Sequence, residues 1–204
     1  MSEPGSVALT FDAEHPDRSW CPPGAAERIL DVLADAGIRA TFFIQGRWAE
    51  AYPGTARRIA DEGHLIGNHS HHHARMPLLL DRGLQEDMDA ARDAIVQATG
   101  RDPRPWFRCP WGAGREDPRV LDALAAAGYR HVGWHVEVED WEPSRTPQAI
   151  AADAIEGIRR HGGAGTVLLL HTWPGGTVDA LPRVLDDLPD GTRFITVDAL
   201  AEVP

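Results

Sequence analysis

Short apolar runs alternate with longer segments of helical periodicity along almost the whole chain. The clearest runs are Val7–Phe11, Ala40–Ile44 and Thr166–Leu170, and each is followed by a segment with apolar residues at helical spacing. Shorter runs of the same kind are the following: Leu65–Gly67, Trp106–Arg108, Tyr129–Trp134 and Phe194–Val197. This alternation is typical of βα units arranged around a parallel sheet.

The segments between these runs predict helices, several of which begin at a proline or end at a glycine. The expected helices are Gly24–Ala36, Tyr52–Glu62, Leu84–Thr99, Pro118–Ala127, Pro147–His161 and Val178–Leu188. About seven βα units predict one domain with a compact (β/α) barrel that need not be complete. A doubly wound open sheet is the alternative. In both folds, functional side chains collect where parallel strands end.

Composition narrows the range of partners. The chain has 204 residues with a formal net charge of -11, from 31 acidic and 20 basic side chains. Such a surface repels nucleic acid and anionic membranes, so we expect neither as a partner. It also argues mildly against an anionic cell-wall polymer and favours a small soluble substrate.

Cysteine usage and the amino-terminal segment bear on the compartment. Cys21 and Cys109 are the two cysteines, too few for a disulfide framework, although one bridge between them is compatible with the sequence. The start lacks the basic and apolar regions of a signal peptide, and no apolar run has membrane-spanning length. We therefore expect a cytoplasmic protein, while noting that a trimmed secreted parent would look the same.

A histidine cluster follows the third apolar run. His69-Ser70-His71-His72-His73 contains four of the ten histidines. On a helical turn, His69 and His73 would share one face and could chelate a divalent ion together with an oxygen ligand. The competing interpretation is a solvated polar loop.

Other polar residues also follow the predicted strands. Asp12 and Glu14 come directly after the first run, where carboxylates can serve as a metal ligand and a general base, or simply cap the next element. Arg108 can hold a carboxylate, or belong to a plain loop. Asp140 lies in an acidic, aromatic segment. His171 ends the most strand-like run, where it is either an acid–base residue or a satisfied core histidine.

The order and spacing of these segments resemble the polysaccharide deacetylases, carbohydrate esterase family 4. The resemblance covers residues 7 to about 200, and five blocks carry it: Thr10–Glu14 (TFDAE), His69–His73 (HSHHH), Arg108–Gly112 (RCPWG), Asp140–Trp141 and Leu169–His171. It implies that residues 1–204 form a single catalytic domain with a distorted (β/α) barrel of about seven strands. It also implies one divalent ion, zinc first, with cobalt, nickel or manganese as alternatives.

The resemblance assigns a role to each matching residue. Asp12 would be the general base, oriented by Arg108. His69 and His73 would be metal ligands. The remaining roles fall on three residues: the Trp111 backbone N–H would hold the oxyanion, and His171, oriented by Asp140, would protonate the leaving amine.

One position departs from the family pattern. The second aspartate of the first block, a metal ligand in the family, is Ala13 here. Glu14 is the expected replacement, and His15 is the second choice. Because strand residues alternate between faces, we expect a bend or bulge that brings Glu14 to the metal.

These features predict a metal-dependent hydrolase that removes an acetyl group from an N-acetylated sugar or a related small molecule. Two alternatives remain. The same fold could cleave ring amides such as cyclic imides or ureides, or a weakened ligand set could leave a carbohydrate-binding module. The sequence does not define the oligomeric state.

Overall fold

The structure, a computed structural model, describes residues 5–15, 22–162, 164–202 and 204. The chain divides into two compact units, which are described separately below. The first comprises Met1–Phe11, Arg18–Thr41 and Trp134–Glu202, and the second comprises Asp12–Asp17, Phe42–Gly133 and Val203–Pro204. The expectation that residues 1–204 form one catalytic domain therefore stays a prediction.

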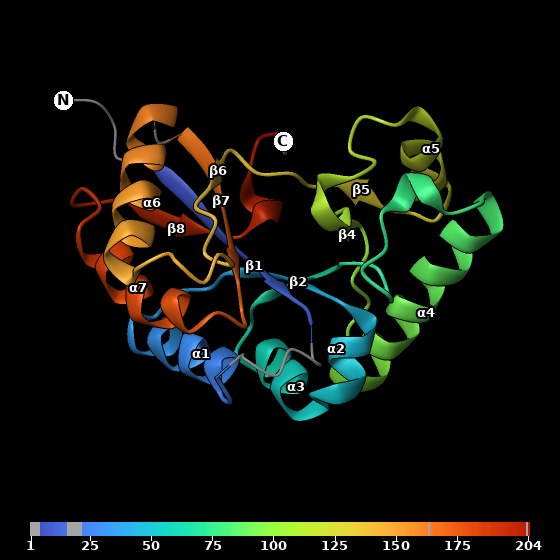
Figure 1. The fold of residues 1–204 in the computed structure, drawn as a ribbon, viewed down its shortest axis with the longest axis horizontal. Helices are drawn as coiled ribbons and strands as arrows, with labels where there is room; N and C mark the ends of the chain where they lie inside the picture. Colours follow the sequence, from blue (N-terminus) through green and yellow to red (C-terminus); the bar gives the residue numbers. More distant parts are fainter. Residues whose placement is uncertain (1–4, 16–21, 163, 203) are drawn as a thin grey trace. The chain divides into compact units, whose positions relative to one another are not determined.

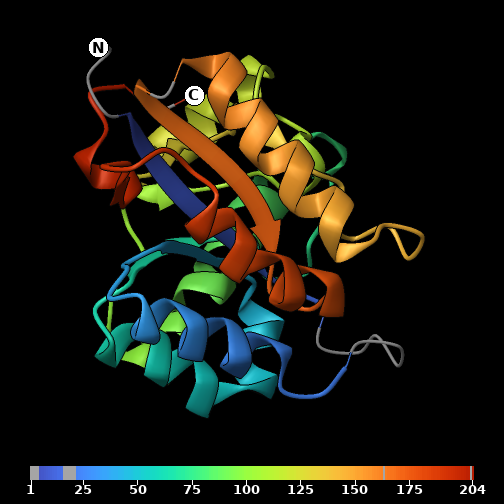
Figure 2. The ribbon, with the colours of Figure 1, turned by 90° about the vertical axis from the view of Figure 1, so that its left-hand side faces the viewer.

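Parallel strands and three helices build the first unit. Its strands are β1 (Ser6–Ala13), which runs on into the second unit, β6 (Val136–Glu137), β7 (Ala164–His171) and β8 (Arg193–Ile195), in the order β8-β1-β7-β6. Its helices are α1 (Ala25–Asp35), α6 (Pro147–His161) and α7 (Gly175–Asp186), with the short 3-10 helix η3 (Val197–Ala199). Helix α6 packs against α7 and β7, as Figure 2 shows. The middle of β7, the run Val167–Leu170, is apolar and buried.

Strand β1 is the central element of this unit. It pairs in parallel with β8, with Val7 opposite Phe194. Residues 7–13 are all buried, which is usual for a parallel strand covered on both faces. An apolar strand of this kind carries its last residues, including Asp12, to the carboxyl end of the sheet.

The second unit repeats the βα pattern. Its strands are β2 (Thr41–Ile44, whose first residue belongs to the first unit), β3 (Leu65–Asn68), β4 (Trp106–Phe107) and β5 (Arg130–His131), in that order across the sheet. Its helices are α2 (Gly46–Ala51), α3 (Pro53–Asp61), α4 (Asp81–Thr99) and α5 (Pro118–Ala126), with the 3-10 helices η1 (Met76–Leu78) and η2 (Pro110–Gly112). Figure 1 shows α4 as the long green helix of this unit.

Helix α4 shows why these segments are helical. Leu84, Met88, Ala91 and Ile95 recur every three or four residues, and all four are buried. The helix ends at Gly100, which has a φ of 71° that costs glycine little. Helix α4 thus packs its apolar face against α2, α3 and β3.

Every predicted helix and strand is present, with ends shifted by a few residues. The largest shifts are at the starts of α4 and α7, which begin at Asp81 and Gly175, and at the end of β5, which stops at His131. Helix α2 was not predicted, because six residues are too few to display a period. Within the described residues, no helix is both long enough and apolar enough to cross a membrane.

Candidate metal centre and active site

Two carboxylates stand at the end of β1. Asp12 and Glu14 are two residues apart, so they project from the same side of an extended chain. His69 Nε2 lies 3.4 Å from an Asp12 oxygen and 3.2 Å from a Glu14 oxygen. Glu14 is the first residue beyond β1, and the chain bends directly after it, since His15 has a φ of 55°. Glu14 thus reaches the histidines from the end of the strand, in place of an aspartate at position 13.

The histidine segment after β3 is a loop rather than the helical turn considered from its spacing. Ser70 and His73 adopt positive φ angles of 65° and 57°, which are uncommon for residues other than glycine. The His69 amide donates to the Ile44 carbonyl at 3.0 Å. The Asp87 carboxylate, from α4, accepts hydrogen bonds from the amides of residues 71 and 72 at 2.9 and 3.1 Å. These bonds hold an otherwise unfavourable backbone in place.

Glu14, His69 and His73 form a cluster suited to a metal ion. One possible ligand atom from each lies within 4.8 Å of the others. His69 Nδ1 is 2.9 Å from the Arg108 carbonyl, which can only accept, so Nδ1 carries a proton and Nε2, which faces Asp12 and Glu14, is the nitrogen that could bind an ion. Two imidazoles and one carboxylate are a common ligand set of catalytic zinc sites. The residues present therefore fit a divalent ion.

The two imidazoles differ in their electrostatic surroundings. Burial lowers the pKa of His73, and the neighbouring Glu14 carboxylate opposes this only in part. For His69, burial also acts to lower the pKa, but the carboxylates of Asp12 and Glu14 outweigh it, so the pKa is raised. A cation is thus favoured at the point where these carboxylates and His69 meet.

His15 supports Glu14 from the other side. Its Nε2 lies 3.0 Å from Glu14 Oε1, whereas Glu14 Oε2 faces His69 and His73. The His15 amide donates to Gln45 Oε1 at 3.0 Å. His15 is not part of the cluster whose ligand atoms lie close together. This arrangement suits a residue that orients Glu14 better than it suits a fourth ligand.

Arg108 and Asp12 form a buried ion pair. The guanidinium is fully buried, and its Nη1 donates to Asp12 Oδ1 at 2.9 Å. Its Nε and Nη2 donate to the carbonyls of Val132 and Gly133 at 3.2 and 2.9 Å, and the group lies over the Phe43 ring. Burial lowers the pKa of Arg108, and Asp12 opposes that shift. The pair fixes the direction of the carboxylate.

Cys109 and Trp111, which follow Arg108, lie in different surroundings: the first is buried and the second is exposed. Cys109 is buried among apolar residues that include Met88 and Phe107, and burial raises the pKa of its thiol to about 12. It is therefore a core residue rather than a ligand, and a bridge to Cys21 is untested because Cys21 lies outside the described residues. Trp111 is 54% exposed, has a φ of 61°, and donates from its indole to the His73 carbonyl at 3.3 Å.

A second hydrogen-bonded group lies in the first unit. His171 Nδ1 is 2.7 Å from Asp140 Oδ1, and the His171 amide donates to Asp140 Oδ2 at 2.8 Å. Thr177, in the first turn of α7, donates to the same oxygen at 2.6 Å. Because a carboxylate accepts the proton of Nδ1, Nε2 of His171 is the nitrogen that can exchange a proton with another molecule.

Four supporting residues were missed from the sequence: Gln45, Asn68, Asp87 and Thr177. Asn68 shows why. Its amide donates to the Met88 carbonyl and the Tyr129 hydroxyl, and its oxygen accepts from the Ser70 amide. Nothing local marks such a residue, because its partners come from distant segments. Only its place directly before His69 could have drawn attention to it.

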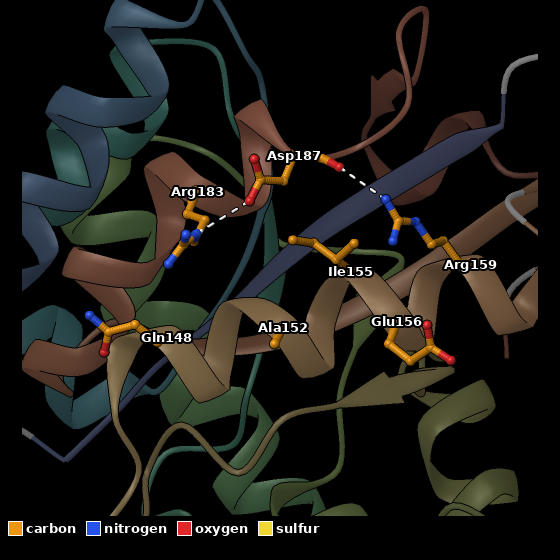
Figure 3. Close-up of a pocket in the computed structure, with 7 residues that line it drawn as sticks. All are labelled: Gln148, Ala152, Ile155, Glu156, Arg159, Arg183 and Asp187. Carbon is orange, nitrogen blue, oxygen red and sulfur yellow. Dashed lines mark hydrogen bonds and ion pairs between the residues drawn. The ribbon is translucent and has the colours of Figure 1, made fainter.

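The first unit also has a groove that contains none of the predicted site residues. It runs between α6 and α7 and is lined by Gln148, Ala152, Ile155, Glu156, Arg159, Arg183 and Asp187. Arg183 pairs with the Asp187 carboxylate, and Arg159 donates to the Asp187 carbonyl (Figure 3).

Comparison with known proteins identifies the family of this chain. A sequence model described as polysaccharide deacetylase matches residues 2–132. A peptidoglycan-N-acetylglucosamine deacetylase of Bacillus cereus is 32% identical over 200 residues, which is 95% of this chain and 67% of the relative. The peptidoglycan-N-acetylmuramic acid deacetylase PdaA of Bacillus subtilis is 30% identical over 196 residues, 96% of this chain and 71% of the relative.

Among solved structures, a family 4 carbohydrate esterase pseudoenzyme from Bacillus anthracis superposes with a TM-score of 0.82. It is 24% identical, and the match covers 99% of this chain and 67% of that one. This likeness confirms the predicted fold class, a distorted and incomplete (β/α) barrel. The family model and the named deacetylase relatives define a hydrolase of carbon–nitrogen bonds other than peptide bonds. The chain belongs to the polysaccharide deacetylase family.

Proposed function

We propose that this chain hydrolyses the amide bond of an N-acetylated sugar, releasing acetate and a free amine. The observation that carries the proposal is the cluster of Glu14, His69 and His73 beside Asp12, whose carboxylate Arg108 holds in place. The names of the relatives support the substrate class, since both are deacetylases of N-acetylated sugars in peptidoglycan.

In this proposal, Glu14, His69 and His73 hold one divalent ion. Zinc suits these ligands best, and cobalt, nickel and manganese also accept them. When bound, the ion would lower the pKa of a water molecule and polarise the acetyl carbonyl. Because Nδ1 of His69 donates to the Arg108 carbonyl, Nε2 is the nitrogen with which His69 would hold the ion.

Asp12 takes the proton from the attacking water. Arg108 occupies Oδ1, which leaves Oδ2, the oxygen 3.4 Å from His69 Nε2, to accept that proton. The backbone N–H of Trp111 stabilises the negative oxygen that forms on the acetyl carbon. Both residues border the ligand cluster: Asp12 lies beside His69, and the Trp111 ring lies 4.8 Å from that of His73.

His171 completes the reaction by giving a proton to the leaving amine. It acts as an imidazolium that Asp140 stabilises through Nδ1, so the proton leaves from Nε2. Thr177 fixes the Asp140 carboxylate. The net change is one water consumed, one carbon–nitrogen bond broken, and acetate and amine formed.

A binding function without catalysis is the second candidate. Two observations favour it: Ala13 replaces the usual ligand, and a pseudoenzyme shares the fold. A ring-amide hydrolase is the other alternative, and its product would be a ring-opened acid instead of acetate.

The test is acetate release from neutral chitooligosaccharides by protein loaded in turn with zinc, cobalt, nickel and manganese. We expect acetate with at least one metal, and loss of activity after chelation that returns when the ion is restored. Acetate that persists unchanged in fully chelated protein would contradict the role of the metal. Sugar binding without acetate from any loaded form would favour the binding function.

A further inference from the structure

An arginine and an exposed tryptophan stack beside the ligand cluster. The Arg75 guanidinium carbon lies 5.1 Å from the centre of the Trp111 ring. The same ring lies 4.8 Å from that of His73, and its indole nitrogen donates to the His73 carbonyl. Trp111 thus connects a proposed metal ligand to Arg75, and its hydrogen bond fixes the plane on which the guanidinium rests.

No described carboxylate neutralises the charge of Arg75. Among the described residues, no carboxylate forms an ion pair with Arg75, and its guanidinium donates no hydrogen bond to any of them. Two exposed arginines of this unit are paired, Arg82 with Glu86 at 2.7 Å and Arg119 with Asp81 at 2.8 Å. Arg75 instead places a positive charge beside the site in a chain whose net charge is -11.

The planar fork of a guanidinium matches a carboxylate, and stacking on an aromatic face leaves its edge free to donate. A neutral sugar would make little use of this edge. We propose that Arg75, held by Trp111, binds a carboxylate carried by the N-acetylated sugar substrate. The inference rests on the proposed function and names its substrate class: an amino sugar with an acidic substituent close to the acetamido group.

The net charge limits how acidic that substrate can be. A strongly negative surface repels polyanions over about a Debye length, roughly 8 Å at physiological salt. One cation can attract a single carboxylate locally but cannot offset a dense row of anions. The structure therefore favours a substrate with isolated carboxylates over a highly charged polymer.

The test compares two matched substrates on zinc-loaded protein. One is an N-acetylmuramic acid glycan fragment with its lactyl carboxylate free, and the other is the same fragment with that carboxylate converted to a methyl amide. We expect wild type to prefer the acid, and Arg75→Gln to lower the ratio of the two kcat/KM values about tenfold. Arg75→Lys should keep part of the preference. Arg82→Gln, which removes an exposed arginine that is already paired, should keep all of it.

Binding of both fragments, measured by calorimetry on the same proteins, separates this inference from the proposed function. If wild type releases no acetate but binds the acid better than the amide, and Arg75→Gln removes the difference, the subsite stands and the deacetylase proposal fails. An unchanged preference in Arg75→Gln, in both turnover and binding, would overturn the subsite. A wild type that shows no preference for the acid would overturn it equally.

Discussion

At the scale of single residues, this site depends on how each polar group is held. One carboxylate oxygen of Glu14 contacts His15, and the other contacts the two histidines proposed as ligands. Asp12 is fixed by a guanidinium that comes from 96 residues away in sequence. Each reactive group thus has a partner that sets its direction, as supporting residues of metal sites generally do.

The His15→Ala variant tests whether His15 orients the Glu14 carboxylate. Without the bond to Oε1, the Glu14 carboxylate can rotate away from the ligand position, so we expect zinc affinity to fall about tenfold. Glu14→Ala should weaken binding much further, because it removes the ligand itself. Competition with a chromophoric chelator measures both. Equal losses in the two variants would mean that His15 is itself a ligand.

At the scale of elements, the sequence predicted the framework better than the site. The strands that position Asp12, His69 and His171 could be predicted because apolar runs and helical periods are local signals. The loop that bears His69 and His73 could not, since its shape depends on Asp87 from α4 and on left-handed backbone angles. The spacing of the histidines suggested a helical turn. Hydrogen bonds to α4 hold a loop there instead, and this loop also brings His69 and His73 together.

The Asp87→Ala variant measures how much that loop depends on α4. It leaves the amides of residues 71 and 72 without an acceptor, so we expect zinc affinity to fall about tenfold and the free energy of unfolding to fall by about 1 to 3 kcal/mol. Asp87→Asn keeps one acceptor oxygen and should lie between wild type and Asp87→Ala. Calorimetry for zinc and urea unfolding give the two quantities. Unchanged zinc affinity in Asp87→Ala would show that the loop holds its shape without this carboxylate.

At the scale of the whole molecule, the family could be predicted from the sequence only through resemblance. Blocks in order indicated the family, and the fold and the comparisons confirmed it. The replacement of the family's aspartate by Ala13 could not be judged from sequence. The structure places Glu14, directly beyond β1, 3.2 Å from His69 Nε2, which shows how this chain can supply a carboxylate from the next position.

Stability of the folded chain should fall in mild acid, in part because of His131. Burial, together with the positive charges of Arg108 and Arg115, lowers the pKa of this imidazole to about 4. Well above pH 6.5, His131 is neutral in both the folded and the unfolded chain. As the pH falls toward 4, the unfolded chain binds a proton at His131 that the folded chain does not bind. Stability is therefore lost over that range.

The His131→Gln variant isolates this contribution. Between pH 7 and pH 5, we expect the wild type to lose about 1 to 2 kcal/mol more unfolding free energy than the variant, measured by urea titration at both values. Identical losses would mean that His131 gains a proton as readily in the folded protein as in the unfolded chain.

The most direct test of the central claim is zinc content and acetate release for wild type, Glu14→Gln and Asp12→Asn, measured together. The account predicts about one zinc per wild-type chain, little zinc and little acetate for Glu14→Gln, and full zinc with turnover lowered on the order of a hundredfold or more for Asp12→Asn. Full zinc content and undiminished acetate release in Glu14→Gln would contradict it, because the carboxylate that replaces the family's aspartate would then hold no metal.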